Sequence, residues 1–281
     1  IINLKNIIQM SVSKKETKRV TVQTLQAMKA KGEKITMLTA YDYTMAKIID
    51  GAGIDIILVG DSAANVMAGY ETTLPMTLEA MIYHASAVVR ACSRALVVAD
   101  LPFGTYQSDP QRALDSAIKM MKESGAQAVK LEGGREIGEG IRRILDAGIP
   151  VIGHLGLTPQ SINKFGGYGL RAKEDAEAQR LKEDALYLQE LGCSAIVLEK
   201  IPSLLAKEVT LSLSIPTIGI GAGSGVDGQV LVSQDFFGMF VDYKPKFVRQ
   251  YLNLHEQMTK AVTEYINDVK SVSFPNENEQ Y

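Results

Sequence analysis

The sequence predicts a single (β/α)8 barrel, because short apolar segments alternate with longer amphipathic segments from about Lys34 onward. The apolar segments are rich in β-branched residues, as expected of strands buried on both faces of a parallel sheet. The chain has 281 residues, and a (β/α)8 barrel normally takes about 250. No dinucleotide-binding glycine motif opens the series, which favours a barrel over a doubly wound sheet.

The expected strands are short and almost entirely apolar. We expect seven of them at residues 35–40, 54–59, 95–99, 128–131, 151–153, 195–198 and 217–220. A weaker eighth strand is expected around residues 237–242, where the apolar pattern is less regular. Seven repeats of strand and helix with a weaker eighth are what an eight-fold barrel requires.

Amphipathic patterns between these strands predict the helices. They fall at residues 43–50, 78–91, 110–124, 136–146, 175–190 and 203–213, with a preceding helix at 20–31 and a closing helix at 246–270. Gly125, Gly148 and Gly192 suit helix C-caps, and Pro110 suits the first turn of a helix.

No break in composition marks a linker, so residues 20–270 are expected to form one catalytic barrel domain. Residues 1–19 are expected to be a leader, either disordered or in part an upstream remnant, since Met10 would make a sensible start. The apolar residues 1–9 lack the cleavage pattern of a signal peptide. Residues 271–281 are expected to be a flexible tail.

Composition excludes several classes of protein. The chain has 30 Lys and Arg against 32 Asp and Glu, a formal charge of −2 that gives no reason to bind nucleic acid or an anionic membrane surface. No apolar run approaches the roughly 20 residues of a membrane span. Cys92 and Cys193 lie far apart, which excludes a disulfide framework and a thiolate zinc site. We therefore expect a cytoplasmic protein.

Ionisable residues follow six successive strands, and this is the strongest functional signal. They are Asp42 after the first strand, Asp61 next to Ser62, Asp100, Lys130 with Glu132, His154 and Glu199. The carboxyl ends of barrel strands meet at one mouth, where barrel enzymes carry their chemistry. A single acidic residue after a strand is often only a helix N-cap, but capping does not explain six such ends in a row.

Three of these residues suggest a metal site. Asp61, Asp100 and Glu132 offer hard oxygen ligands, which suit Mg²⁺ completed by water and substrate oxygens. Zinc is not expected, because the three histidines have no zinc-ligand spacing. Such a metal, with a lysine and a glutamate nearby, suits chemistry on an α-keto acid.

The same pattern leaves alternatives open for the other residues. Lys130 suits the substrate carboxylate or an ordinary salt bridge with Glu132, and Glu199 suits a general base or an ion-paired cap. His154 is equally suited to a structural and a functional role. The glycine-rich residues 218–225 indicate either an anion-binding loop or a tight turn, and residues 156–171 indicate a lid or binding loop.

Ordered sequence blocks also resemble a known family. They are TAYD at 39–42, VGDS at 59–62, TLPMT at 73–77, ADLPF at 99–103, VKLEGG at 129–134, GHLGLTPQS at 153–161, FGGY at 165–168, LE at 198–199 with Pro202, IGIGAG at 218–223, DGQ at 227–229 and PKF at 245–247. Together they resemble the ketopantoate hydroxymethyltransferases. One departure is Ala63-Ala64, where the family often has a bulkier residue and a glycine, which puts the shape of that loop in doubt.

The resemblance implies a barrel of the phosphoenolpyruvate/pyruvate type and a homo-oligomer, commonly a decamer. It implies transfer of a hydroxymethyl group from 5,10-methylenetetrahydrofolate to 3-methyl-2-oxobutanoate, the first step of pantothenate biosynthesis. On the family pattern, one Mg²⁺ per subunit is held by Asp61, Asp100 and Glu132. Ser62 and Lys130 hold the keto acid together with Asp61 and Asp100, Glu199 accepts the proton, and His154 lines the pocket.

Two other functions are weighed against this one. A carbon–carbon lyase or mutase of the phosphoenolpyruvate/isocitrate lyase type would share the metal site, but neither Cys92 nor Cys193 follows a strand to supply the catalytic cysteine of the lyases. A non-catalytic keto-acid-binding barrel is expected to have lost some of the ionisable strand-end residues, and all of them are present.

Overall fold

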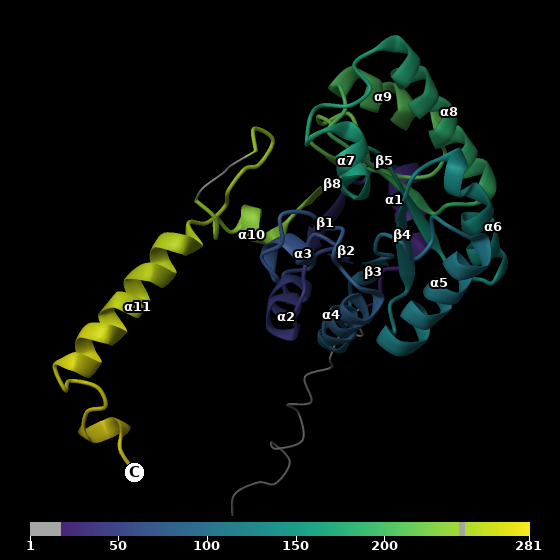
Figure 1. The fold of residues 1–281 in the computed structure, drawn as a ribbon. Coiled ribbons are helices and arrows are strands. Elements are labelled where there is room, and N and C mark those ends of the chain that lie inside the picture. The colour runs from purple at the N-terminus through teal and green to yellow at the C-terminus, as the bar shows by residue number, and fades with distance from the viewer. Residues whose placement is uncertain (1–17, 242–244) are drawn as a thin grey trace, which may run out of the picture.

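The structure is a computed structural model that describes residues 18–241 and 245–281. Eight parallel strands form a closed barrel in sequence order, which confirms the predicted fold class (Figure 1). The strands are β1 (Ile35–Thr39), β2 (Ile56–Val59), β3 (Leu96–Asp100), β4 (Ala128–Glu132), β5 (Val151–Gly156), β6 (Ala195–Glu199), β7 (Thr217–Ile220) and β8 (Gly228–Leu231). The first seven match the predicted segments, with ends that differ by up to three residues. Pairing of β8 with β1 closes the barrel.

The helices and short 3₁₀ turns cover the outside of the barrel for most of its circumference (Figure 1). The helices are α1 (Val22–Lys31), α2 (Tyr43–Gly51), α3 (Ala63–Val66), α4 (Leu78–Ala91), α5 (Pro110–Ser124), α6 (Gly138–Asp146), α7 (Ile162–Phe165), α8 (Asp175–Leu191), α9 (Ser203–Ser212), α10 (Ser233–Phe236) and α11 (Leu254–Lys270), and the 3₁₀ turns are η2 (Arg135–Ile137), η3 (Pro159–Ser161) and η4 (Glu277–Glu279). Local sequence explains their limits. In α5, Asp109 caps the first turn and Gly125, at φ 77°, ends the helix.

Helix α1 closes the N-terminal end of the barrel. Its Leu25 is fully buried in the same cluster as the barrel-interior residues Ile35, Ile56 and Leu96, which lie near the starts of their strands. Lys29 holds the other end of α1 by an ion pair with Asp227, at 2.8 Å. The opposite end of the barrel is therefore the one available for chemistry.

The predicted position of the eighth strand is wrong. The eighth strand is β8, whereas residues 237–241 form a turn and loop, and residue 242 lies outside the described residues. Phe237, the first residue of the predicted segment, instead packs edge-on against the Phe236 ring of α10, and that ring stacks on Tyr251 with centroids 4.5 Å apart. Short strands with a glycine and a glutamine, such as β8, carry little apolar signal of their own.

The connection from β7 to β8 contains no helix, in contrast to the predicted alternation. Residues 221–227 instead return along the outside of the barrel against α9. Gly223 has φ +79°, and a Cβ at this position would lie 2.4 Å from the Cβ of Ser203. The glycine-rich segment therefore serves close backbone packing, the second of its two predicted interpretations.

The C-terminal helix does not close the barrel as predicted. It begins at Leu254 rather than at residue 246, because residues 245–253 form turns and Asn253 caps the first turn. None of its residues is buried, and Figure 1 shows α11 leading away from the barrel. Residues 271–281 continue from it and include η4. Among all the helices that the structure describes, none has both the length and the apolar character to cross a membrane.

Candidate active site

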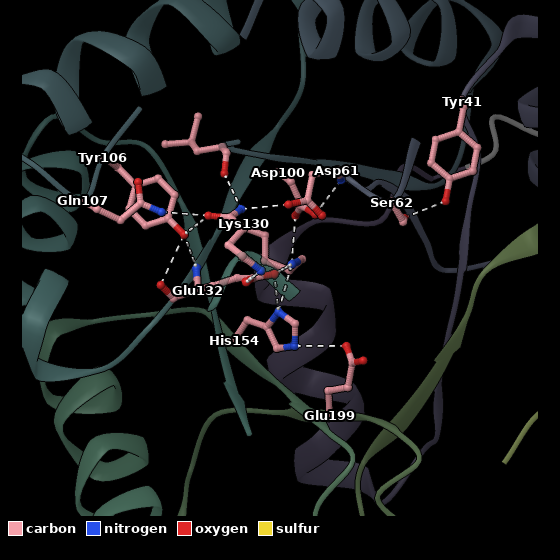
Figure 2. Close-up of polar contacts among 12 residues, drawn as sticks. Tyr41, Asp61, Ser62, Asp100, Tyr106, Gln107, Lys130, Glu132, His154 and Glu199 are labelled. Atoms are coloured by element: carbon pink, nitrogen blue, oxygen red, sulfur yellow. Dashed lines mark hydrogen bonds and ion pairs between the residues drawn. The ribbon is translucent and has the colours of Figure 1, made fainter. Parts of the chain in front are cut away.

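Five of the six predicted strand ends, those of β2 to β6, bring their ionisable residues together at the C-terminal mouth of the barrel (Figure 2). Asp42, after β1, instead caps α2, where its Oδ1 accepts the backbone N–H of Met45 at 2.9 Å. Strand register explains part of the arrangement, because Asp100 pairs with Lys130 and Glu132 pairs with His154 on adjacent strands. Asp61, two residues beyond the end of β2, donates its backbone N–H to Asp100 Oδ2 at 3.0 Å. All five side chains are buried, and only Glu199, at the end of β6, retains 16% exposure of its side chain.

Lys130 lies at the centre of the cluster and, within residues 18–241 and 245–281, is the only Lys or Arg in contact with its carboxylates. Its Nζ lies 3.1 Å from Asp100 Oδ1, 3.9 Å from Glu132 Oε1 and 3.2 Å from His154 Nδ1. Burial disfavours the ammonium, but the neighbouring carboxylates outweigh burial and raise the pKa of Lys130. Lys130 is therefore charged, and its predicted ion pair with Glu132 is present together with a closer one to Asp100.

The three carboxyl groups of the cluster, those of Asp61, Asp100 and Glu132, have raised pKa values. Burial, together with the charge of Glu132, raises the pKa of Asp61 to about 7. Burial raises the pKa of Asp100 and of Glu132 to about 7 as well, against the opposing charge of Lys130. One lysine cannot neutralise three buried carboxylates, so the cluster is short of positive charge.

His154 connects this cluster to Glu199. Burial first, and the charge of Lys130 second, lower the pKa of His154 to about 4, so its ring is neutral at pH 7. Its Nδ1 lies 3.2 Å from both Lys130 Nζ and Glu132 Oε1, and its Nε2 lies 3.3 Å from Glu199 Oε2. The neutral ring is therefore placed between the carboxylates of Glu132 and Glu199.

Ser62 lies at the edge of the site beside Tyr41. The two hydroxyl oxygens are 2.8 Å apart, and Tyr41 is fully buried (Figure 2). Burial raises the pKa of Tyr41, so its hydroxyl is protonated and orients Ser62. The adjoining Ala63 and Ala64 form the first residues of α3, and both are buried. A helical backbone accepts alanine, so the departure from the family pattern leaves this loop intact.

Gln160 and Tyr106 are site residues that sequence reasoning missed. The Gln160 side-chain amide donates to Asp61 Oδ2 at 2.9 Å, and its backbone N–H donates to Glu132 Oε2 at 2.9 Å. Tyr106 donates its hydroxyl to Gln160 Oε1 at 2.7 Å. Both residues are neutral and lie in loops, where polar side chains are common. The only signal was the position of Gln160 within the block at 153–161 and within the predicted binding loop at 156–171.

The donor set fits a hard divalent cation. Asp100 Oδ1 and Glu132 Oε1 are buried, and they have ion-pair contacts with Lys130 and with His154 respectively. Mg²⁺ is commonly held by one or two carboxylates, with water and substrate oxygens completing its shell. Within residues 18–241 and 245–281, no three His, Cys, Asp or Glu side chains are placed to hold a metal ion together. The hard carboxylate oxygens fit a cation that takes the rest of its shell from water and substrate.

Comparison with known proteins settles the family. The model of the ketopantoate hydroxymethyltransferase family matches residues 19–277. The chain belongs to this family. Two relatives, each described as 3-methyl-2-oxobutanoate hydroxymethyltransferase, come from Christiangramia forsetii and Flavobacterium johnsoniae. They are 66% and 67% identical to this chain, over 97% of it and 100% of each relative.

Solved structures agree with the fold of a ketopantoate hydroxymethyltransferase family member. Phosphonopyruvate hydrolase, in complex with oxalate and Mg²⁺, has a TM-score of 0.60 at 14% identity, over 92% of this chain and 93% of that chain. The 2,3-dimethylmalate lyase of the PEP mutase/isocitrate lyase superfamily has a TM-score of 0.57 at 16% identity, over 91% of this chain and 89% of that chain. These similarities confirm the predicted (β/α)8 barrel.

Proposed function

We propose that this chain transfers a hydroxymethyl group from 5,10-methylenetetrahydrofolate to 3-methyl-2-oxobutanoate. The product is 2-dehydropantoate, and the reaction is the first step of pantothenate biosynthesis. The observation that carries the proposal is the convergence of Asp61, Asp100, Lys130, Glu132 and His154 with Glu199 at one barrel mouth, in a member of the ketopantoate hydroxymethyltransferase family.

We assign the metal site to Asp61 and Asp100, with Glu132 completing it, and one Mg²⁺ per subunit. When bound, Mg²⁺ supplies Lewis-acid polarisation of the keto and carboxylate oxygens of the substrate. The support is the shortage of positive charge among three buried carboxyl groups that share the charge of Lys130. Asp61 and Asp100, which would hold the ion, also line the keto-acid site.

The remaining residues bind the keto acid and move its proton. The ammonium of Lys130 and the hydroxyl of Ser62 bind the substrate carboxylate at the closed side of the site. Glu199, which is the most exposed of the ionisable group, accepts the proton from C3 of the keto acid. The enolate carbon bonds to the methylene carbon as one of its two C–N bonds to the folate breaks. Water then replaces the second C–N bond, which leaves the hydroxymethyl group on the product and releases tetrahydrofolate. Neutral His154 holds the Glu199 carboxylate beside the substrate.

The test follows the C3 proton of 3-methyl-2-oxobutanoate by NMR in deuterated buffer with enzyme and Mg²⁺. We expect loss of the C3 signal first, and formation of 2-dehydropantoate after methylenetetrahydrofolate is added. Exchange without product would refute the folate assignment and leave the enolising site standing. If folded, metal-loaded protein gives no exchange and no product, the proposal that the chain is a transferase is refuted.

The two other functions gain no support from the structure. Cys92 and Cys193 are buried and lie before β3 and β6, at the end of the barrel opposite the mouth, where a lyase cysteine has no role. A non-catalytic barrel has no need of a general base aligned on a neutral histidine, as Glu199 is on His154.

We also propose that the protein is a cytoplasmic homo-oligomer, with a decamer expected from the family. Its two cysteines are free and buried, which suits a reducing compartment. The support for oligomerisation is the exposed apolar stripe of α11, formed by Met258, Val262, Tyr265, Ile266 and Val269. A second uncovered surface is a groove of about 560 Å³ outside β1 and β8, beside α2. Apolar surfaces of this kind mark contacts between chains.

The oligomer is tested by sedimentation of two matched variants. Val262→Asp places a charge in the apolar stripe of α11, and Asn267→Asp places the same charge on another face of the same exposed helix. We expect Val262→Asp to lower the molar mass in solution and Asn267→Asp to leave it unchanged. A monomeric wild-type protein would refute the proposal.

A further inference from the structure

The side-chain amide of Gln160 has a partner for each of its hydrogen-bonding positions. Gln160 lies in η3 and is buried. Its Nε2 donates to Asp61 Oδ2 at 2.9 Å and to the backbone oxygen of Leu101 at 3.0 Å. Its Oε1 accepts from the Tyr106 hydroxyl at 2.7 Å and from Gln107 Nε2 at 2.8 Å. An amide has two donors and two acceptor positions, so this group is fully satisfied.

These partners permit only one orientation of the amide. Rotation by half a turn would place Nε2 against the amide donor of Gln107 and Oε1 against the carboxylate of Asp61. Asp61 Oδ2 and the Leu101 oxygen can only accept, and Gln107 is itself oriented because its Oε1 accepts the backbone N–H of Gly104 at 2.8 Å. The orientation of the Gln160 amide therefore follows from its surroundings, and the amide in turn fixes Asp61.

Gln160 engages one oxygen on each of two carboxylates. Its side chain holds Asp61 Oδ2, and its backbone N–H holds Glu132 Oε2 at 2.9 Å. The other oxygen of Glu132, Oε1, faces His154 Nδ1 at 3.2 Å and Lys130 Nζ at 3.9 Å. The connection between β5 and α8 thus holds, through Gln160, one oxygen of each of two carboxylates that follow or end β2 and β4.

We propose that Gln160 is a positioning residue that orients the Asp61 carboxylate for a divalent cation. The inference rests on the metal site of the proposed function. Groups that hydrogen-bond a metal ligand hold its orientation, and their loss typically lowers metal affinity by about 10- to 100-fold. Gln160 has this relation to Asp61 although the two residues are far apart in the chain.

The test compares Gln160→Met with a matched control, Gln127→Met, by Mn²⁺ titration followed by electron paramagnetic resonance. Methionine keeps the length of the side chain and removes its donors, while the backbone N–H to Glu132 is retained. Gln127 makes similar structural bonds, from Val97 N–H to its Oε1 at 2.9 Å and from its Nε2 to the Gly125 oxygen at 2.7 Å. It lies just before β4, at the opposite end of the barrel.

We expect Gln160→Met to weaken Mn²⁺ binding at least about tenfold, and Gln127→Met to leave it unchanged. Equal affinity in wild type and Gln160→Met would overturn the inference while the metal site stands. If the wild type itself bound no Mn²⁺, the metal site of the proposed function would fall together with the inference. Equal losses in both variants would overturn it too, because the effect would then be general destabilisation.

A second variant covers the case in which Gln160→Met does not fold. Tyr106→Phe removes the hydroxyl that donates to Gln160 Oε1 and leaves every other contact of Gln160 in place. We expect a smaller loss of Mn²⁺ affinity, because the amide keeps one of its two orienting donors. Wild-type affinity in Tyr106→Phe together with unfolded Gln160→Met would overturn the positioning role.

Discussion

Replacement of Glu199 by glutamine isolates the general base from the rest of the site. Glutamine has almost the same shape as glutamate, and its carbonyl oxygen can still face His154 Nε2, from which Glu199 Oε2 lies 3.3 Å away. The side chain is 16% exposed and bonds to no buried backbone group, so the exchange leaves the fold unchanged. Only the ability to accept a proton is lost.

The magnitude follows from what a general base contributes. Proton transfer by a positioned side chain accelerates a reaction by about 10²- to 10⁴-fold, so we expect kcat to fall about 10³-fold. At about 1.4 kcal/mol for each factor of ten, this loss corresponds to roughly 4 kcal/mol of transition-state stabilisation. Binding of the keto acid is expected to change by less than about threefold, because Lys130, Ser62 and the metal site are untouched.

The assay measures C3 proton exchange of 3-methyl-2-oxobutanoate by NMR, and keto-acid binding by thermal shift in the presence of Mg²⁺. Glu190→Gln, an exposed exchange of the same type on α8, is the control and is expected to behave as wild type. Exchange at the wild-type rate in Glu199→Gln would remove Glu199 from the role of base. Loss of binding with loss of exchange would instead show that Glu199 holds the substrate.

Three further predictions concern stability and reactivity. Asp50 accepts bonds from the backbone N–H groups of Ala95 and Ser93 at 2.7 and 2.8 Å, so Asp50→Asn is expected to lower the free energy of unfolding by roughly 2–4 kcal/mol in urea at pH 7. Burial raises the pKa of Asp50, but these hydrogen bonds outweigh burial and hold the pKa below its usual value. The contribution of Asp50 to the free energy of unfolding is therefore present above the unfolded pKa of ~3.9 and is lost as the pH falls through the lower folded pKa. A stability difference between wild type and Asp50→Asn that persists unchanged at pH 2 would contradict this. Gly223→Ala is expected to lower the free energy of unfolding by about 2 kcal/mol more than Gly148→Ala does. Both positions have a positive φ, but only a Cβ at Gly223 would meet another atom, so equal thermal shifts would refute the packing argument. Burial raises the pKa of both cysteine thiols to about 12, so neither is expected to react with a disulfide reagent at pH 8 until the protein is denatured, and fast reaction of the native protein would refute this.

Local patterns in the chain predicted much of the fold and much of the site. Seven strands were found from apolar runs, and helices α4 and α5 were predicted at both ends, because burial on two faces and helix caps leave marks within a few neighbouring residues. The same holds for Asp61, Asp100, Lys130, Glu132, His154 and Glu199, since a residue that follows a parallel strand must lie at the barrel mouth.

Other features depend on residues distant in the chain and left no local mark. The eighth strand is a short segment that becomes a strand only because β1 and β7 lie on either side of it. The apolar stripe of α11 predicted a helix correctly, but not that the helix leads away from its own barrel.

The sequence by itself determined that this chain is an eight-stranded barrel with a carboxylate-rich mouth, because both properties follow from the alternation of residue types along the chain. Only the tertiary structure decided that Gln160 binds Asp61, 99 residues away. It also decided that the three carboxyl groups are buried around a single lysine, and this burial raises their pKa values to about 7. Hydrogen bonds and electrostatic interactions act over distance in space, and that distance is set by the closed barrel rather than by position in the chain.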